Sequence, residues 1–346
     1  MAHAVGASEK PLPSFVKYRG RHFVTDQQYT RAELEELIAL AIALKGLSRR
    51  KCFTPFLPGR TLAMIFEEPS TRTRVSFEAA MTELGGHAQY LRPGEIHLGV
   101  RESVKDTALV LSRLCHAIEG RLFHNETLME LARWATVPVI NGLTDYDHPI
   151  QSMTDVMTIL EHAGRLDGLT LAFVGCGAES TAHSVALTCS RFGINVVVAA
   201  PPDRQIAPAV QALVRANCAQ SGATFTLTDD PVEAVRDADF VYTLLWWWLE
   251  SEEEKVAIRA KFMPYQVNEE LWAHTKPGAK FMHPLPAVRG EDVTDAIIDH
   301  PSSICWDQAE NRKHFEKAVL LALIGIDELP ADPDLHEIGR ALLPLA

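Results

Sequence analysis

The segment Ser70-Thr-Arg-Thr-Arg74 has the residue types of a phosphate-binding site. It lies between a short apolar run and apolar residues at helical spacing, so we expect it to begin a helix. At a helix N-terminus, free backbone N–H groups and the positive end of the helix dipole attract an anion, and hydroxyls with a guanidinium in the same turn strengthen that attraction. The alternative is an N-cap followed by a solvated basic turn. Two arginines in one turn of an acidic protein favour the phosphate site.

Two other segments begin with the pair His-Pro. In His148-Pro-Ile-Gln151, which precedes a predicted helix, the histidine could donate to a carbonyl oxygen and the glutamine could hold an amide-like NH2 group. In His283-Pro-Leu-Pro286, which follows a predicted strand, two prolines fix a loop whose carbonyl oxygens face outward as acceptors. Taken singly, a lone histidine is usually structural and the second segment is an ordinary turn.

The elements that must position these segments follow from apolar spacing. In the first half, we expect a helix over 31–47 with Thr30 as its cap, a strand over 60–66 and a helix over 75–84. Alternating strands and helices of this kind indicate an α/β protein with two doubly wound parallel-sheet domains joined by helices. In the second half, the expected strands are 169–174, 194–200, 224–227, 240–245 and 280–282, and the expected helices are 151–163, 180–192 and 314–326.

Composition restricts the possible functions. The chain has 346 residues, enough for about two domains, and a formal net charge of −12 without a long Lys/Arg run. Binding to nucleic acid or to an anionic membrane surface is therefore not expected. The six cysteines show no metal or disulfide spacing, and no stretch is apolar enough to span a membrane, so we expect reduced thiols, no metal site and a cytoplasmic location.

Taken together, the ordered motifs resemble one family, the aspartate/ornithine carbamoyltransferases, through nearly the whole chain. The family's S-T-R-T, H-P-x-Q and H-x-L-P signatures match segments 70–73, 148–151 and 283–286. Its isolated arginine matches Arg121 in Glu119-Gly-Arg, and its last signature matches Asp307-Gln-Ala-Glu-Asn-Arg312. The resemblance implies a donor domain over 1–150, to which the helix at 314–346 can return, and an acceptor domain over 151–313.

The same resemblance implies the chemistry. A primary amine would attack carbamoyl phosphate, giving a ureido product and phosphate without a metal or organic cofactor. The implied catalytic residues are Arg72, Thr73, Arg121 and His148. The residues implied to bind carbamoyl phosphate are Ser70, Thr71, Arg72, Thr73, Arg121, His148, Gln151 and Arg312. Family members form trimers with active sites between subunits, so a homotrimer is expected, with the loop 95–100 closing over a neighbour's donor.

Within the family, several segments are most similar to putrescine carbamoyltransferases and next to ornithine carbamoyltransferases, but the acceptor side differs. Leu244 replaces a family aspartate, Trp248 a serine and Glu179 an asparagine, while Pro284 replaces the cysteine of ornithine enzymes. We therefore expect an acceptor other than ornithine, either a diamine or a modified amino acid, with its second amine held by a carboxylate and by cation–π contact with tryptophan. Trp246 matches a family tryptophan and is assigned to the core. The candidate acceptor-binding residues are Glu179, Leu244, Trp247, Trp248, His283, Pro284 and Leu285.

Three alternatives remain. The chain could be a putrescine or ornithine carbamoyltransferase proper. It could also be a catalytically silent regulatory or scaffold subunit, although such a subunit would not need Arg72, Arg121, His148 and Gln151 together. A dinucleotide-binding dehydrogenase is suggested by Gly175-Cys-Gly177, but the next strand ends in Ala-Ala-Pro201 instead of the required carboxylate.

Overall fold

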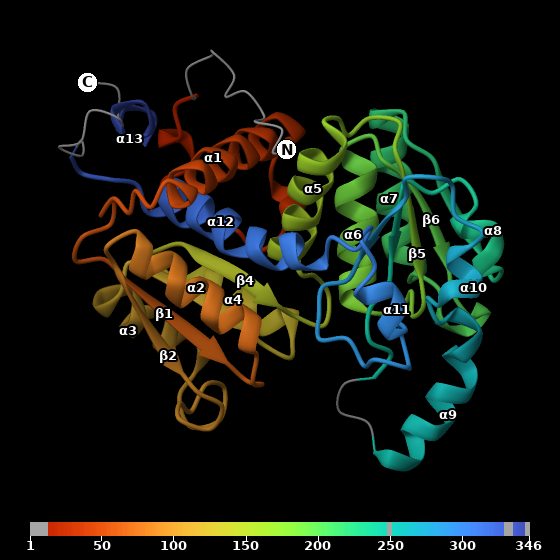
Figure 1. The fold of residues 1–346 in the computed structure, drawn as a ribbon. Helices are drawn as coiled ribbons and strands as arrows, with labels where there is room; N and C mark the ends of the chain where they lie inside the picture. The colour runs from red at the N-terminus through yellow and green to blue at the C-terminus, as the bar shows by residue number, and fades with distance from the viewer. Residues whose placement is uncertain (1–12, 248–250, 329–334, 343–346) are drawn as a thin grey trace. The chain divides into compact units, whose positions relative to one another are not determined.

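The computed structural model describes residues 13–247, 251–328 and 335–342 (Figure 1). The chain forms two compact units, one of residues Met1–Met153 with Asn311–Ala346 and the other of residues Thr154–Glu310. Among the described residues, no helix is long and apolar enough to cross a membrane.

The first unit contains a four-stranded parallel sheet. Its strands are β1 (Thr61–Phe66), β2 (His87–Leu91), β3 (Ala117–Arg121) and β4 (Val139–Leu143). Their order is β2-β1-β3-β4, so the chain starts in the middle of the sheet and moves first to one side and then to the other. β3 is buried along its whole length, as expected for an inner strand covered on both faces.

Helices surround this sheet. They are α1 (Arg31–Arg49), α2 (Thr71–Glu83), α3 (Val104–Leu114), α4 (Asn125–Trp134), the start of α5 (Pro149–Ala163), most of α12 (Cys305–Ile324) and α13 (His336–Leu342). Thr30 caps α1 through a reciprocal capping box with Glu33, which confirms the sequence prediction for this helix start. α1 and α12 run side by side (Figure 1), where Lys45 donates a 2.6 Å hydrogen bond to Asn311.

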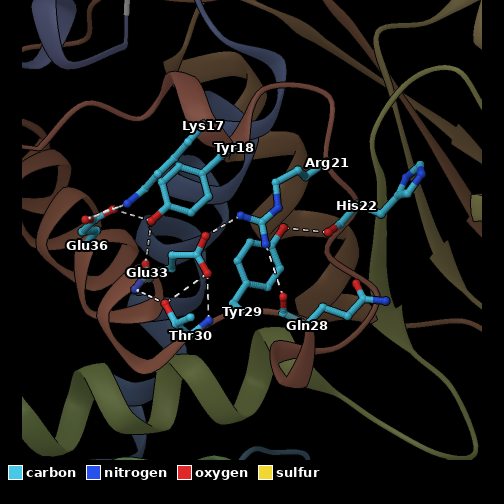
Figure 2. A network of polar contacts seen from close by, with 9 residues as sticks. All are labelled: Lys17, Tyr18, Arg21, His22, Gln28, Tyr29, Thr30, Glu33 and Glu36. Carbon is cyan, nitrogen blue, oxygen red and sulfur yellow. Dashed lines mark hydrogen bonds and ion pairs between the residues drawn. The ribbon is translucent and has the colours of Figure 1, made fainter.

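The segment before α1 is tied to that helix by polar contacts (Figure 2). Tyr18 donates from its hydroxyl to the Glu33 carbonyl oxygen, 3.1 Å away. Arg21 pairs with the Glu33 carboxylate at 2.6 Å and lies over the ring of Tyr29, with 4.1 Å from its guanidinium carbon to the ring centroid. Glu33 therefore serves both the helix cap and the anchoring of the preceding chain.

The second unit contains a five-stranded parallel sheet with the order β7-β6-β5-β8-β9. Its strands are β5 (Thr170–Val174), β6 (Asn195–Ala199), β7 (Phe225–Thr228), β8 (Phe240–Tyr242) and β9 (Lys280–Met282). Its helices are the rest of α5 and the start of α12, with α6 (Ser180–Arg191), α7 (Pro208–Ser221), α8 (Pro231–Val235), α9 (Glu252–Phe262), α10 (Glu269–Trp272) and α11 (Asp295–Ile298). The predicted fold class, two doubly wound parallel-sheet domains, is confirmed.

Among the element boundaries that differ from the sequence prediction, two have a clear local reason. The strand expected over 240–245 ends at Tyr242, because Thr243 turns its hydroxyl to the Val174 carbonyl oxygen at 2.7 Å and the apolar run continues as a buried loop. The helix expected from residue 314 begins at Cys305. Its first turns carry buried polar residues such as Asn311 and Arg312, so they lack the apolar stripe that reveals the later turns.

Candidate active site

The first sheet brings three of the predicted segments to one edge. β1 leads into the start of α2, β3 ends at Arg121, and β4 leads through a loop to His148 and the start of α5. Because β1, β3 and β4 are parallel and adjacent, their carboxyl ends meet at the same edge of the sheet. The topology alone therefore places Arg121 and the two helix starts near one another.

The start of α2 combines a cap with exposed amides. Ser70 is the N-cap, and its hydroxyl oxygen accepts from the Thr73 backbone N–H at 3.4 Å. The cap uses a lone pair and leaves the hydroxyl hydrogen for another acceptor. The backbone N–H groups of Thr71 and Arg72 belong to the first turn, where a helix supplies no carbonyl partner. The capping and phosphate-binding interpretations are therefore compatible.

Arg312 on α12 joins the segments by hydrogen bonds. Its Nη2 donates to the Thr73 hydroxyl at 3.1 Å, and its Nη1 donates to Gln151 Oε1 at 3.2 Å. Nη1 also lies 3.4 Å from His148 Nε2. All four side chains are buried. The last family signature therefore supplies a guanidinium that fixes the side chains of two other signatures.

Positive charge accumulates at this site. Burial, then the charges of Arg312 and Arg121, lower the pKa of Arg72 to about 10. Burial also lowers the pKa of Arg121, although Glu68 pairs with it at 2.5 Å and opposes that change. For His148, burial and the three arginines hold the imidazole pKa well below its usual value. The site can therefore attract a dianion while presenting a neutral imidazole as hydrogen-bonding group.

In the second unit, His283 is held within its own loop. Its Nε2 lies 2.6 Å from Asp292 Oδ2, and its Nδ1 accepts from the Leu285 backbone N–H at 2.8 Å. These bonds occupy both ring nitrogens and support Leu285 at φ +60°, a conformation uncommon for leucine. The ring is buried and contacts Asp292 and the Leu285 backbone, so the assignment of His283 as an acceptor-binding residue stays a prediction.

The other acceptor candidates differ in exposure. Pro284 and Leu285 are partly exposed, whereas Leu244 is only 2% exposed and contributes to the apolar core. Glu179 is the N-cap residue of α6, with one carboxylate oxygen 4.0 Å from Cys176 Sγ. Burial and this carboxylate raise the pKa of the Cys176 thiol to about 12, so it stays protonated. Pro284, Leu285 and Glu179 are thus accessible, while Leu244 acts by filling space.

The tryptophans have separate roles. Trp246 stacks on Phe262 with 5.8 Å between ring centroids and is buried, in agreement with its assignment to the core. Trp247 donates from its indole N–H to Glu291 at 2.8 Å, and the Lys255 ammonium lies 4.1 Å from its ring centroid. A cation of the chain itself therefore occupies the ring proposed for an acceptor amine. Trp248 lies outside the described residues.

One group of metal-ligating residue types occurs among the described residues. Potential ligand atoms of His124, Glu126 and Asp145 lie within 4.8 Å of one another, but all three residues are exposed. Asp145 also accepts from the Asn125 backbone N–H at 2.9 Å, so its carboxylate binds the first backbone amide of α4. We assign no metal to this group.

Comparison with known proteins identifies the family. Residues 21–161 match the carbamoyl-P binding domain of aspartate/ornithine carbamoyltransferase, and residues 167–323 match its Asp/Orn binding domain. The chain belongs to the aspartate/ornithine carbamoyltransferase family. It is an enzyme of the carbamoyltransferase class, and the resemblance found in the sequence motifs is confirmed.

Relatives and solved structures agree with this family assignment. An ornithine carbamoyltransferase of Thermococcus kodakarensis is 46% identical over 310 residues, which are 90% of this chain and 98% of the relative. The structure of ornithine carbamoyltransferase from Pyrococcus furiosus is similar with a TM-score of 0.87 at 45% identity, covering 89% of this chain and 99% of that one. The structure of ornithine carbamoyltransferase from Thermus thermophilus has a TM-score of 0.77 at 38% identity. The match covers 87% of this chain and 98% of that one.

The candidate site also contains residues that the sequence analysis missed. Glu68 pairs with Arg121, and Glu316 accepts from Arg312 at 3.3 Å. Glu119 is fully buried in β3. A glutamate inside the short strand β3 is an available signal of unusual burial, whereas Glu316 resembles any polar helix residue until its surroundings are known.

Proposed function

We propose that the protein transfers the carbamoyl group of carbamoyl phosphate to a primary amine, and that ornithine is the first acceptor to test. The observation that carries the proposal is the hydrogen bonding of Arg312 to Thr73 and Gln151 beside Arg72 and His148. This arrangement supplies positive charge for a phosphate and polar groups for a neutral carbamoyl group. The names of the similar proteins support ornithine as acceptor.

In this proposal the donor phosphate binds at the start of α2, to the Ser70 and Thr71 hydroxyls, the first-turn amides and the Arg72 guanidinium. Arg121 contacts both the phosphate and the carbonyl oxygen. His148 donates its imidazole N–H to the carbonyl oxygen, and Gln151 accepts from the carbamoyl NH2 group. Each contact matches the donor or acceptor capacity of the residue.

The neutral acceptor amine attacks the carbonyl carbon and forms a tetrahedral intermediate. Thr73, Arg121 and His148 stabilise its oxyanion and are already held in place by burial and hydrogen bonds, so little reorganisation is needed. The bond from carbon to the phosphate oxygen then breaks, and the departing phosphate takes the proton of the amine. The products are a ureido compound and phosphate.

A second candidate acceptor is a diamine or a modified amino acid. The sequence favours it because Leu244 is apolar and buried where the family carries an aspartate, and because Glu179 would repel an acceptor carboxylate nearby. The comparisons do not support excluding ornithine, so this candidate rests on those substitutions alone. Trp247 contributes to amine binding only if the amine displaces Lys255 from its ring.

We also propose a homotrimer in which loop 95–100 of one subunit closes over the donor site of the next. Val100 in this loop is 85% exposed, and Val75 on α2 is 55% exposed, so both have apolar surface to cover. The cytoplasmic location expected from the sequence stays a prediction.

The test is to incubate the protein with carbamoyl phosphate and single amines, measuring phosphate release and ureido product. The panel contains ornithine, acetylornithine, aspartate, putrescine, lysine and 2,3-diaminopropionate. Efficient turnover of ornithine supports the first candidate, and turnover of another amine without ornithine supports the second. Donor binding without turnover of any amine would reject catalysis and favour the regulatory or scaffold alternative.

A further inference from the structure

Two buried carboxyl groups lie beside the donor arginines, Glu119 on β3 and Glu316 on α12, and both residues have no solvent exposure. Neither oxygen of Glu119 has a hydrogen-bond partner among the described residues. Glu316 Oε1 accepts from the Ser76 hydroxyl at 2.8 Å and from Arg312 Nη2 at 3.3 Å, while its Oε2 has no such partner. Burying a carboxylate with so few hydrogen bonds is costly, which favours the protonated form.

The backbone of the neighbouring strand makes room for this arrangement. A Cβ atom on Gly142 of β4 would lie 1.7 Å from Glu119 Oε1, so any side chain at position 142 would exclude the carboxyl group from its place. The carboxyl group therefore lies over the backbone of β4, within the sheet's core and away from water. Its position is built into the packing of two adjacent strands.

The charges around the two carboxyl groups couple them to each other and to the arginines. Burial, then the charge of Glu316, raise the pKa of Glu119 well above its usual value, although Arg121 and Arg312 oppose the change. Burial raises the pKa of Glu316 to about 7, against the opposing charge of Arg312 and the bond from Ser76. The charge of Glu316 is one cause of the raised pKa of Glu119, so ionising one carboxyl group favours a proton on the other.

The neighbouring charged groups are the guanidinium groups of Arg121 on β3 and Arg312 on α12, whose charges act on Glu119. The lowered pKa of Arg72 on α2 is about 10, well above neutral pH. His148 at the start of α5 stays neutral, because its pKa is held well below the usual value. The exchangeable proton of this region therefore belongs to the two glutamates.

We propose that Glu119 and Glu316 form a buried carboxyl pair that takes up a proton when the anionic donor binds beside Arg312. Arg312 donates to Glu316 and also to Thr73 and Gln151 at the proposed donor site, so a dianion bound there weakens its stabilisation of the Glu316 carboxylate and adds negative potential. Both effects favour a proton on the pair. By reciprocity, a protonated pair strengthens anion binding, and affinity falls as the pH rises through neutrality.

The two glutamates are positioning residues, because they act on the donor through Arg312. The inference rests on the proposed donor site and is independent of which amine accepts the carbamoyl group. It predicts a proton in the binding equilibrium, which a purely structural role for either glutamate would not produce.

The test uses sulfate as probe, because sulfate stays a dianion from pH 5 to 9 whereas phosphate titrates near neutrality. Calorimetric titration at pH 7, in two buffers of different ionisation enthalpy, counts the protons taken up. We expect up to about 0.5 proton for the native protein, and about a fivefold loss of affinity between pH 6 and 8 if binding raises the apparent pKa of the pair by about one unit.

Glu316→Gln keeps a side chain that can accept from Ser76 and Arg312 but cannot titrate. We expect its proton uptake to fall toward zero and its affinity to become nearly independent of pH. Glu119→Gln is a second variant, which keeps an uncharged side chain at position 119, so the proton uptake that remains in it belongs to Glu316 alone. Glu130→Gln, on the exposed face of α4, is the matched control and should keep the native profile.

Unchanged proton uptake in both Glu316→Gln and Glu119→Gln would overturn the inference. Arg72→Ala tests separately whether sulfate binds at the proposed donor site. If it does, removing the Arg72 guanidinium must weaken sulfate binding, and unchanged binding would mean that the donor-site assignment has failed. The amine-panel assay at saturating carbamoyl phosphate is a third measure, because it reports whether the native protein transfers the carbamoyl group, whatever the pH dependence of donor affinity.

Discussion

Arg312 donates a hydrogen bond to the Thr73 hydroxyl, 3.1 Å away, although 239 positions separate the two residues in the chain. The bond joins α12, near the end of the sequence, to the first turn of α2. Through Nη1 the same guanidinium reaches Gln151 in the first turn of α5. The proposed donor site is thus assembled within one compact unit from three helices that are distant in sequence.

Replacing Arg72 with alanine should reduce kcat/KM for carbamoyl phosphate by about 10²-fold or more, because it removes a charge-assisted partner of the phosphate. Steady-state kinetics of phosphate release measures the effect. Arg74→Ala is the control, since Arg74 points away to Glu78 and lies over the Tyr90 ring. Near-normal turnover by Arg72→Ala would refute the donor-site assignment.

Replacing Arg312 with lysine should raise KM for carbamoyl phosphate at least about tenfold. A single ammonium cannot replace the planar fork that reaches Thr73 and Gln151 at once. KM for the acceptor amine, measured at saturating donor, should change much less. Lys313→Arg, one residue further along α12, preserves its charge and should leave donor KM unaltered. Equal rises of KM for both substrates in Arg312→Lys would contradict a donor-specific role.

Glu316→Gln should change how stability depends on pH. Folding raises the pKa of Glu316 to about 7, so between about pH 4.5 and 7 the unfolded chain has lost a proton that the folded chain retains. The free energy of unfolding contributed by this group is therefore largest at low pH and is lost as the pH rises through 7. Removing the carboxyl group should reduce the difference in unfolding free energy between low and high pH by up to about 3 kcal/mol. Urea unfolding at pH 5 and pH 8 measures this difference. An equal change in unfolding free energy for the variant and the native protein would contradict the prediction.

Replacing Asp292 with alanine should impair acceptor use specifically. Asp292 Oδ2 pairs with His283 Nε2, and its Oδ1 accepts from the Val288 backbone N–H at 2.8 Å, so the loop that carries Leu285 loses two supports. We expect KM for the acceptor to rise several-fold while donor KM stays near its native value. The control is Asp295→Ala, an exposed partner of Arg289 in the same region. An effect confined to donor KM would exclude the positioning role of His283.

Sedimentation should show a particle of three chains. Reversing the apolar character of loop 95–100 with Val100→Asp should weaken the assembly, because that side chain is 85% exposed in the single chain and is proposed to be covered by a neighbour. Activity and sedimentation are measured at the same protein concentration. A fully active monomer would refute both the trimer and the role of the loop.

Local features of the fold could be predicted from the sequence because they depend on neighbouring residues. Thr30 and Glu33 make a capping box within one helical turn, and Ser70 caps α2 through Thr73, three positions away. The strand β9, at Lys280–Met282, has the predicted bounds. Alternating strands and helices also determine a parallel sheet, since the chain must return across one face before each new strand.

Only the tertiary structure decided the roles of the buried polar residues. His283 had the residue type of a substrate contact, yet Asp292 and the Leu285 backbone occupy its ring. Glu119 and Glu316 are nearly 200 positions apart, and the charge of one acts on the other only because folding brings both into the same compact unit. A hydrophobic pattern reports which face of an element is buried. It cannot report which charge lies opposite, because the pKa and the hydrogen bonds of a buried group depend on side chains that folding brings from distant parts of the chain.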